Sequence, residues 1–296
     1  MDGLIVIDKP VGPTSHDVVA RMRRVLGERR IGHTGTLDPN ASGVLPLVVG
    51  RATRLAKFLS GERKRYETIV RLGVATTTYD GEGTQVGARW TGPLPSRDEI
   101  DRALDPFRGT FLQQPPVYSA KKIDGERSYA SARSGAAVMP APVMVSVDRL
   151  EVSDVAGDEL TLHVDCSAGF YVRSLAHDLG KRLGTGAHVS ALRRTASGDL
   201  TLDDAIPLEF AERSRDDAIA ALLPLDAMLP QFGAVALTDE GLLRALHGRN
   251  IGAGEVASGS VHATEPIRLV DQLGHLVGIA EPTPADGVLH PSVVLR

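Results

Sequence analysis

Apolar and polar positions along the chain form patterns that predict both helices and strands. Apolar residues recur at helical spacing over residues 16–26, with Thr14 or Ser15 as the candidate cap. Ser96 opens a Ser-x-x-Glu capping box, which predicts another helix to about Leu104. Strands are expected over residues 3–8, 44–49, 66–74, 143–152, 159–165 and 188–195, and further helices near 53–59 and from 172 to about 183.

These elements favour an α+β fold over a doubly wound sheet, because strands and helices are mixed without a βαβ repeat. A composition shift after residues 223–225 predicts two domains, over residues 1–225 and 226–296. The second domain is expected to be small and mostly β, with a helix near 238–247, a hairpin over 267–279 and a strand near 293–295.

Composition excludes several classes of protein. Apolar residues are 42% and charged residues 24% of the 296 residues, which is typical of a globular protein with a real core. The longest apolar stretch, residues 43–50, is far shorter than the ~20 residues of a membrane helix, and we expect no signal peptide. The single cysteine, Cys166, excludes an internal disulfide and favours a cytoplasmic setting.

Charge is distributed unevenly, although the formal net charge is −4. Residues 1–75 hold 13 Lys and Arg against 7 Asp and Glu, a net of +6, whereas both later parts of the chain are acidic. A local basic region can bind phosphates whatever the total charge, and the alternative is a solvated surface without a partner.

The segment over residues 32–43 has no periodicity, three glycines and one carboxylate, Asp38. An Asp-Pro pair alone would most often begin a turn. Gly32–Gly35 matches the Gly-x-x-Gly clamp of KH modules only in spacing, and the segment lacks the Gly-Lys-Ser/Thr ending of a nucleotide P-loop. His163 and Cys166 lack further ligands at a suitable spacing, so no metal site is expected.

The same segment, Gly32-His-Thr-Gly-Thr-Leu-Asp-Pro-Asn-Ala-Ser-Gly43, resembles the signature of the bacterial tRNA pseudouridine-55 synthase family (TruB). Further segments match in the same order, namely Gly3–Pro10, Lys64–Tyr66, Thr76–Gly81, Tyr118–Lys122, Gly169–Arg173 and Gly186–Thr195. Leu246–Ile251 and the Pro291-x-Val-Val-Leu ending are similar to a PUA-type RNA-binding domain.

The resemblance implies a pseudouridine-synthase catalytic fold, with a mixed, largely antiparallel sheet and flanking helices, and a PUA-like C-terminal domain. It implies an isomerase that converts uridine-55 in the T arm of tRNA to pseudouridine by N-glycosidic cleavage, base rotation and C5–C1′ rejoining. No cofactor is expected, because the reaction is redox-neutral. We expect a monomer that needs no protein partner and no membrane.

In this resemblance Asp38 is the catalytic aspartate, Arg173 pairs with it, and Asp80 helps to hold that arginine. Burial disfavours a charged carboxylate and a neighbouring guanidinium favours it, so the pairing suits the chemistry. Thr77 stands where the family often has an acid.

Base extrusion is expected to use aromatic and apolar side chains, because the target base is stacked inside the folded RNA. The resemblance implies that Tyr66 stacks on the flipped uracil and takes part in catalysis, and that His33 fills the vacated space. Tyr171 and Leu192 are implied as further pocket residues.

Basic residues are predicted to position the RNA through its phosphates. The candidates are Lys9, Lys64, Arg65, Arg193 and Arg194, together with Lys121, Lys122, Arg127 and Arg133 of a thumb over about residues 113–142. This thumb, with one helical turn near 128–133, is expected to become ordered on RNA. Two alternatives stay open: an RNA-binding or tRNA-folding protein with secondary catalysis, and an rRNA-directed, RNA-guided synthase of the same superfamily.

Overall fold

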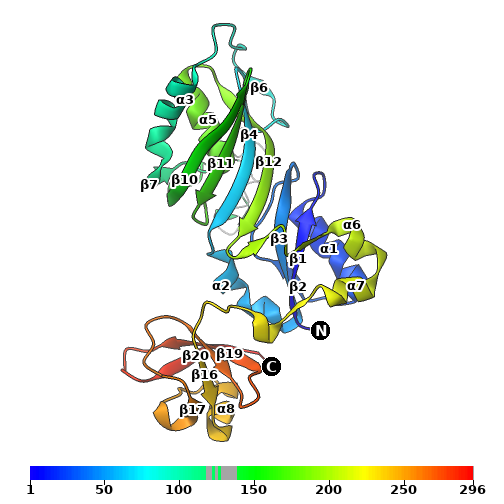
Figure 1. Ribbon diagram of the computed structural model, residues 1–296, viewed down its shortest axis with the longest axis vertical. Coiled ribbons are helices and arrows are strands. Elements are labelled where there is room, and N and C mark those ends of the chain that lie inside the picture. The colour runs from blue at the N-terminus through cyan, green and yellow to red at the C-terminus, as the bar shows by residue number, and fades with distance from the viewer. Residues whose placement is uncertain (118–121, 124–125, 128–138, 296) are drawn as a thin grey trace.

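The computed structural model describes residues 1–117, 122–123, 126–127 and 139–295. One large sheet dominates the molecule, and a smaller sheet lies at one end of its long axis (Figure 1). In the described part of the chain the large sheet has 11 strands. Its main order is β14 (Ala205–Pro207), β1 (Gly3–Lys9), β3 (Ala41–Val49), β12 (Ala187–Ser197), β4 (Lys64–Leu72), β11 (Glu159–Cys166), β10 (Val143–Ala156) and β7 (Gly109–Gln113).

Three short strands pair at the side of this order. They are β2 (Ile31–His33) on β3, β13 (Leu200–Thr201) on β12 and β15 (Leu223–Pro224) on β1. Only the pairs β1–β14 and β3–β12 are parallel among the described strands of this sheet. The expected mixed, largely antiparallel sheet is therefore confirmed.

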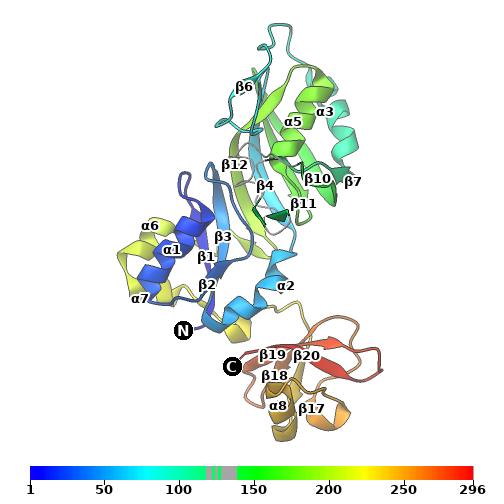
Figure 2. The same ribbon diagram turned by 180° about the vertical axis from the view of Figure 1, so that it is seen from behind.

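Helices cover the sheet on both halves (Figure 2). One half carries α1 (Ser15–Leu26), α6 (Leu208–Arg213) and α7 (Arg215–Ala220), and the other carries α3 (Arg97–Leu104) and α5 (Val172–Leu183). Helix α2 (Ala56–Ser60) lies between the large sheet and the C-terminal part, and α8 (Asp239–Leu246) packs on the smaller sheet. The described residues also form the 3₁₀ turns η1 (Gly50–Leu55), η2 (Asp105–Phe107), η3 (Leu225–Ala227) and η4 (Ala253–Glu255). Ser96 forms the predicted capping box of α3, and of the two candidate caps of α1 it is Thr14 that caps the helix, also through a capping box. The pair α6 and α7 was not anticipated, because two six-residue helices are too short to show a periodic pattern.

Two apolar cores lie side by side under the large sheet. The first packs β4, β10, β11 and β12 against α3 and α5, with Leu162 and Leu175 at its centre. The second packs β1 and β3 against α1 and α6, with Leu45 and Met22 at its centre. Tyr66 and Leu192 contact both cores, so the central strands β4 and β12 carry these residues at the junction of the two halves.

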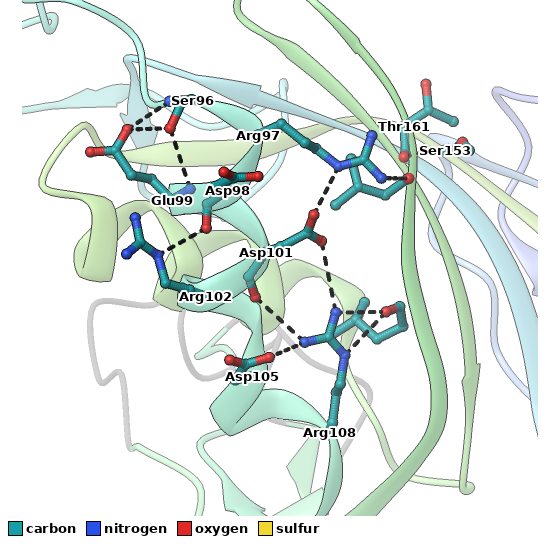
Figure 3. A network of polar contacts seen from close by, with 12 residues as sticks. Ser96, Arg97, Asp98, Glu99, Asp101, Arg102, Asp105, Arg108, Ser153 and Thr161 are labelled. Carbon is teal, nitrogen blue, oxygen red and sulfur yellow. Dashed lines mark hydrogen bonds and ion pairs between the residues drawn. The ribbon is translucent and has the colours of Figure 1, made fainter.

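Arg97 and Arg108, in and just after α3, donate hydrogen bonds to carbonyl groups at the free edge of β10 (Figure 3). Strand β7 pairs only with residues 143–147 of β10, which leaves later carbonyl groups without a strand partner on that side. Arg108 donates from Nη2 to the Leu150 carbonyl oxygen at 3.1 Å, and Arg97 donates to that of Val152. Arg97 is held in turn by Asp101 at 2.9 Å. These contacts fix α3 along a strand edge that would otherwise offer itself for pairing.

A five-stranded sheet forms the C-terminal part, in the order β17 (Val256–Ser258), β16 (Ala234–Leu237), β18 (Ile267–Val270), β19 (Leu276–Pro282) and β20 (Leu289–Val294). It rests on η1 and α2 of the first part, where Phe58 meets Phe232 edge-on at 5.6 Å and Lys57 pairs with Glu281 at 3.0 Å. A small, mostly β unit was expected here, and its boundary at residue 226 stays a prediction.

The described residues also form two short hairpins outside these sheets, β5 (Ala75–Thr76) with β6 (Gln85–Val86) and β8 (Lys122–Ile123) with β9 (Glu126–Arg127).

Gly43 allows the backbone of β12 to approach β3. Its φ is +103°, and a Cβ atom at this position would lie 2.1 Å from the carbonyl oxygen of Arg194. We expect Gly43→Ala to lose about 1 kcal/mol for the backbone conformation and about 1–3 kcal/mol more for the overlap. Chemical denaturation would measure the loss. Gly12→Ala is the matched control, because Gly12 has φ +113° and, among the described residues, no atom within 4 Å of that Cβ position. Equal losses in both variants would contradict this explanation.

Candidate active site

The loop between β2 and β3 carries Asp38 and is fastened from below. The sequence predicted irregular structure over residues 32–43; the structure shortens it to 34–40, because β2 reaches His33 and β3 begins at Ala41. Ser15 at the start of α1 accepts from the Leu37 amide at 2.9 Å. The Lys9 ammonium group donates to the carbonyl oxygens of Pro39 at 3.2 Å and Ala41 at 2.7 Å. These bonds hold Asp38 at the top of the loop.

Arg173 lies between two carboxylates. Its Nε is 2.9 Å from Oδ2 of Asp38, and its Nη1 is 3.6 Å from Oδ2 of Asp80. Nη1 also donates to the Thr78 carbonyl oxygen at 3.0 Å. The side chain of Arg173 is 8% exposed and that of Asp38 is 40% exposed, so the guanidinium group is buried while the carboxylate reaches solvent. The structure thus brings together the three charged residues that the sequence grouped.

A cavity of about 430 Å³ opens beside this pair. Its polar lining residues include Asp38, Lys64, Tyr66, Tyr171, Arg173 and Arg194. Leu192, Val143 and Phe170 add apolar surface. A carboxylate, an aromatic ring and an apolar floor in one concave site form a suitable enclosure for a flat polar ring such as a nucleobase.

The Tyr66 hydroxyl lies against the Arg194 guanidinium group. Burial raises the pKa of Tyr66, and the charge of Arg194 and its hydrogen bond to the phenol oppose that rise. Arg194 is itself fixed, since Nε donates to the Val44 carbonyl oxygen at 2.7 Å and Nη2 to that of Gly35 at 3.1 Å. Tyr66 is therefore a protonated phenol at neutral pH, held by a rigid cation.

Three of the basic residues expected to contact phosphates are buried. Lys9 is 0%, Arg194 1% and Lys64 6% exposed, and each donates to backbone carbonyl groups. The expectation of a phosphate contact is therefore wrong for Lys9, whose ammonium group organises the Asp38 loop. Lys64 and Arg194 line the cavity and place positive charge inside it rather than on an outer surface.

The remaining predicted residues have different surroundings. Arg65 is exposed on β4, and Arg193 on β12 forms an ion pair of 2.7 Å with Asp8 on β1. His33 lies at the end of β2, edge-on to His16 at 5.3 Å, and is not among the residues that line the cavity. Lys122 lies in the β8–β9 hairpin, which is described only through its backbone. Lys121, Arg133 and the helical turn expected near 128–133 lie outside the described residues.

Gln113 is a site residue that the sequence did not single out. Its amide accepts from the Tyr171 backbone N–H at 2.8 Å and donates to the Tyr171 carbonyl oxygen at 3.0 Å. The next residue, Gln114, donates to the Pro140 carbonyl oxygen at 2.7 Å and so joins the two ends of the 113–142 segment. The only signal was a pair of amides directly before Pro115 and Pro116.

Comparison with known proteins assigns this geometry to a family. Residues 23–172 match the model described as TruB family pseudouridylate synthase (N terminal domain). Residues 173–230 match that described as tRNA pseudouridylate synthase B C-terminal domain. A protein of Solibacter usitatus (strain Ellin6076) named tRNA pseudouridine synthase B is 43% identical over 297 residues, all of both chains. The chain belongs to the TruB family.

Other relatives agree with this membership. A tRNA pseudouridine synthase B of Geobacillus kaustophilus (strain HTA426) is 46% identical over 248 residues, which cover 81% of this chain and 87% of the relative. Among solved structures, the chain is similar to one in a Cbf5-Nop10-Gar1 complex, with TM-score 0.74, 27% identity, and 99% and 85% of the two chains covered. The similarity confirms the α+β pseudouridine-synthase fold. The family models end at residue 230, before the five-stranded sheet.

Two searches of the described residues bear on partners. No described helix is long and apolar enough to span a membrane. In the same residues, no group of three or more His, Cys, Asp and Glu side chains is placed to hold a metal ion.

Lys64 predicts a pH-dependent contribution to activity. Burial lowers the pKa of Lys64 to about 8, so its charge is present in the cavity at pH 7 and absent at pH 9.5. We expect Lys64→Met to reduce kcat/KM about fivefold at pH 7, equivalent to about 1 kcal/mol, and to approach wild type at pH 9.5. Steady-state kinetics across this pH range measures the ratio of kcat/KM between wild type and Lys64→Met. Lys9 ionises in both proteins, so its effect cancels in this ratio. Arg213→Met, which removes an exposed positive charge on α6, is the control. A ratio independent of pH would contradict the assignment.

Proposed function

We propose that the protein isomerises uridine-55 in the T arm of tRNA to pseudouridine. The observation that carries the proposal is the Asp38–Arg173 contact of 2.9 Å at a cavity lined by Tyr66. Curated relatives 38–46% identical to the chain bear the name tRNA pseudouridine synthase B, which supports tRNA as the substrate. A cytoplasmic monomer fits this role.

Asp38 supplies the reactive group. A carboxylate can serve as nucleophile or as base, and the contact with Arg173 positions that of Asp38 at the cavity. In the reaction the N1–C1′ bond of the nucleoside breaks, the uracil turns, and C5 bonds to C1′. The proton of C5 leaves and N1 gains one, so the atoms balance without an oxidant or a cofactor.

Tyr66 and Leu192 receive the base. Extrusion from the RNA stack costs a few kcal/mol, and base–aromatic stacking returns about 1–3 kcal/mol. Both residues are fixed by the two apolar cores, so the enclosure is formed before RNA binds. Arg65, Lys122 and Arg193 are proposed to position the phosphates, and Tyr171 to contact the base. For His33 the proposal is that it fills the space that the base leaves.

The two alternatives make different demands on the site. A tRNA-folding protein with lost catalysis would not need the Asp38–Arg173–Asp80 arrangement, which is intact. The second alternative is an RNA-guided, rRNA-directed synthase, but the chain is 27% identical to the solved protein of a Cbf5-Nop10-Gar1 complex and 43% identical to a curated tRNA pseudouridine synthase B. The tRNA reaction is favoured on both counts.

Asp38→Asn tests the reaction directly. The amide keeps the shape of the side chain but can neither attack carbon nor accept a proton efficiently. We expect turnover to fall by at least 1000-fold while tRNA affinity stays within a few fold, measured by tritium release from 5-labelled uridine in a tRNA transcript and by filter binding. Asp203→Asn, a change at an exposed turn, is the control. Normal turnover by Asp38→Asn would refute the proposal, and a transcript with the T-loop target replaced should release no tritium.

Tyr66 is tested by separating its ring from its hydroxyl. We expect Tyr66→Ala to lose at least 100-fold in kcat and about tenfold in affinity, because a stacked ring contributes about 1–3 kcal/mol, the apolar surface of Leu192 remains, and the hydroxyl acts on the reacting base. Tyr66→Phe should restore affinity but not the full rate. Single-turnover assays and binding isotherms measure both quantities. Unchanged activity in the alanine variant would make Tyr66 a core residue only.

A further inference from the structure

The loop that presents Asp80 to Arg173 contains an unfavourable backbone conformation. Tyr79 has φ 64°, in the left-handed region that bulky residues rarely adopt. A residue in this state costs about 1–3 kcal/mol and persists only where its surroundings hold it. Its two neighbours supply two of the partners of Arg173, the Thr78 carbonyl group and the Asp80 carboxylate. The conformation of Tyr79 therefore sets the positions of both partners.

The Tyr79 ring is held by a stack on α5. It lies flat on His177, with ring centroids 3.8 Å apart and an interplanar angle of 14°. His177 follows Arg173 by four residues, so both side chains leave the same face of the helix. Burial, and then the charge of Lys181, lower the pKa of His177, so the ring is neutral at pH 7. One helix face thus holds the active-site arginine and the ring that fixes the loop opposite it.

Hydrogen bonds fasten the rest of the loop but leave the ring out. The Tyr79 carbonyl oxygen accepts from the Val189 amide of β12 at 3.0 Å, and the Asp80 carbonyl oxygen accepts from the Thr76 hydroxyl at 2.7 Å. Oδ1 of Asp80 accepts from the Glu82 amide at 3.1 Å, which turns Oδ2 toward Arg173. Arg173 joins this loop to α5 through its charged side chain, and the Tyr79–His177 stack joins them through two uncharged rings.

We propose that the Tyr79–His177 stack is a positioning device for the active-site arginine. It holds the left-handed turn so that the Thr78 carbonyl group and Asp80 both meet Nη1, which leaves Nε directed at Asp38. Neither ring lines the 430 Å³ cavity, so neither is a catalytic residue. The inference rests on the proposed function, because its consequence is the rate of the Asp38 reaction.

Replacement of either ring tests the stack. We expect Tyr79→Ala and His177→Ala to lower kcat about tenfold in the tritium-release assay, with KM within about twofold, because the arginine is misdirected after RNA has bound. Tyr79→Phe and His177→Phe keep the flat contact and should restore at least half of the wild-type kcat. In an Asp80→Asn background, Tyr79→Ala should have little further effect, since the partner that it positions is already altered. An additive loss in that background would overturn the proposal.

A second variant guards against misfolding. Tyr79→Gly removes the ring and at the same time relieves the left-handed strain, so it folds even where the alanine variant does not, as thermal melting would show. Its kcat should still fall about tenfold. Wild-type kcat in the glycine variant, or a raised KM with unchanged kcat, would overturn the positioning role. Absence of tritium release by the wild-type enzyme would instead refute the proposed function, so the two failures are distinguishable.

Discussion

A buried guanidinium group needs compensating charge, and this need organises the centre of the molecule. Arg173 is nearly enclosed, and without its two carboxylate partners it would be an uncompensated buried charge. Its partners come from the 34–40 loop and from the 77–84 loop, which are far from α5 in sequence. The sheet has to bring all three segments together before any of them is useful. The exposed oxygen of Asp38 is the part of this arrangement that faces the cavity.

The cavity lies where two of the apolar cores packed on the large sheet meet. Tyr66 and Leu192 lie where the cores meet, on the adjacent strands β4 and β12. Arg194 on β12 passes beneath this junction and bonds to the carbonyl groups of Val44 and Gly35 on the other half. This wall of the cavity is thus held by both cores, which suits the proposed binding of an extruded base without rearrangement.

Charge explains how an acidic chain can provide a site for RNA. The net charge is −4, yet Lys64, Arg173 and Arg194 line one cavity and Lys9 lies below it. Burial, and after it the positive charge of Arg194, lower the pKa of Lys9 and of Lys64 to about 8, while Asp38 opposes the shift at Lys9; both values reflect the cost of holding a charge in the interior. A polyanion that enters the site relieves part of this cost. The buried cations therefore do a different task from surface lysines, which act at longer range.

The sequence by itself determined most of the elements and singled out Asp38 as the candidate catalytic residue. Helices such as α1 and α3 follow from apolar spacing and capping boxes, which are local properties, and Asp38 stands in an ordered set of motifs. Short elements such as β2, α6 and α7 carry too few residues to show a period. Only the tertiary structure decided that Lys9 is enclosed, that Gln113 grips Tyr171, and that Tyr79 stacks on His177. Burial and contacts between distant segments depend on how the strands pair, and no local pattern encodes that pairing.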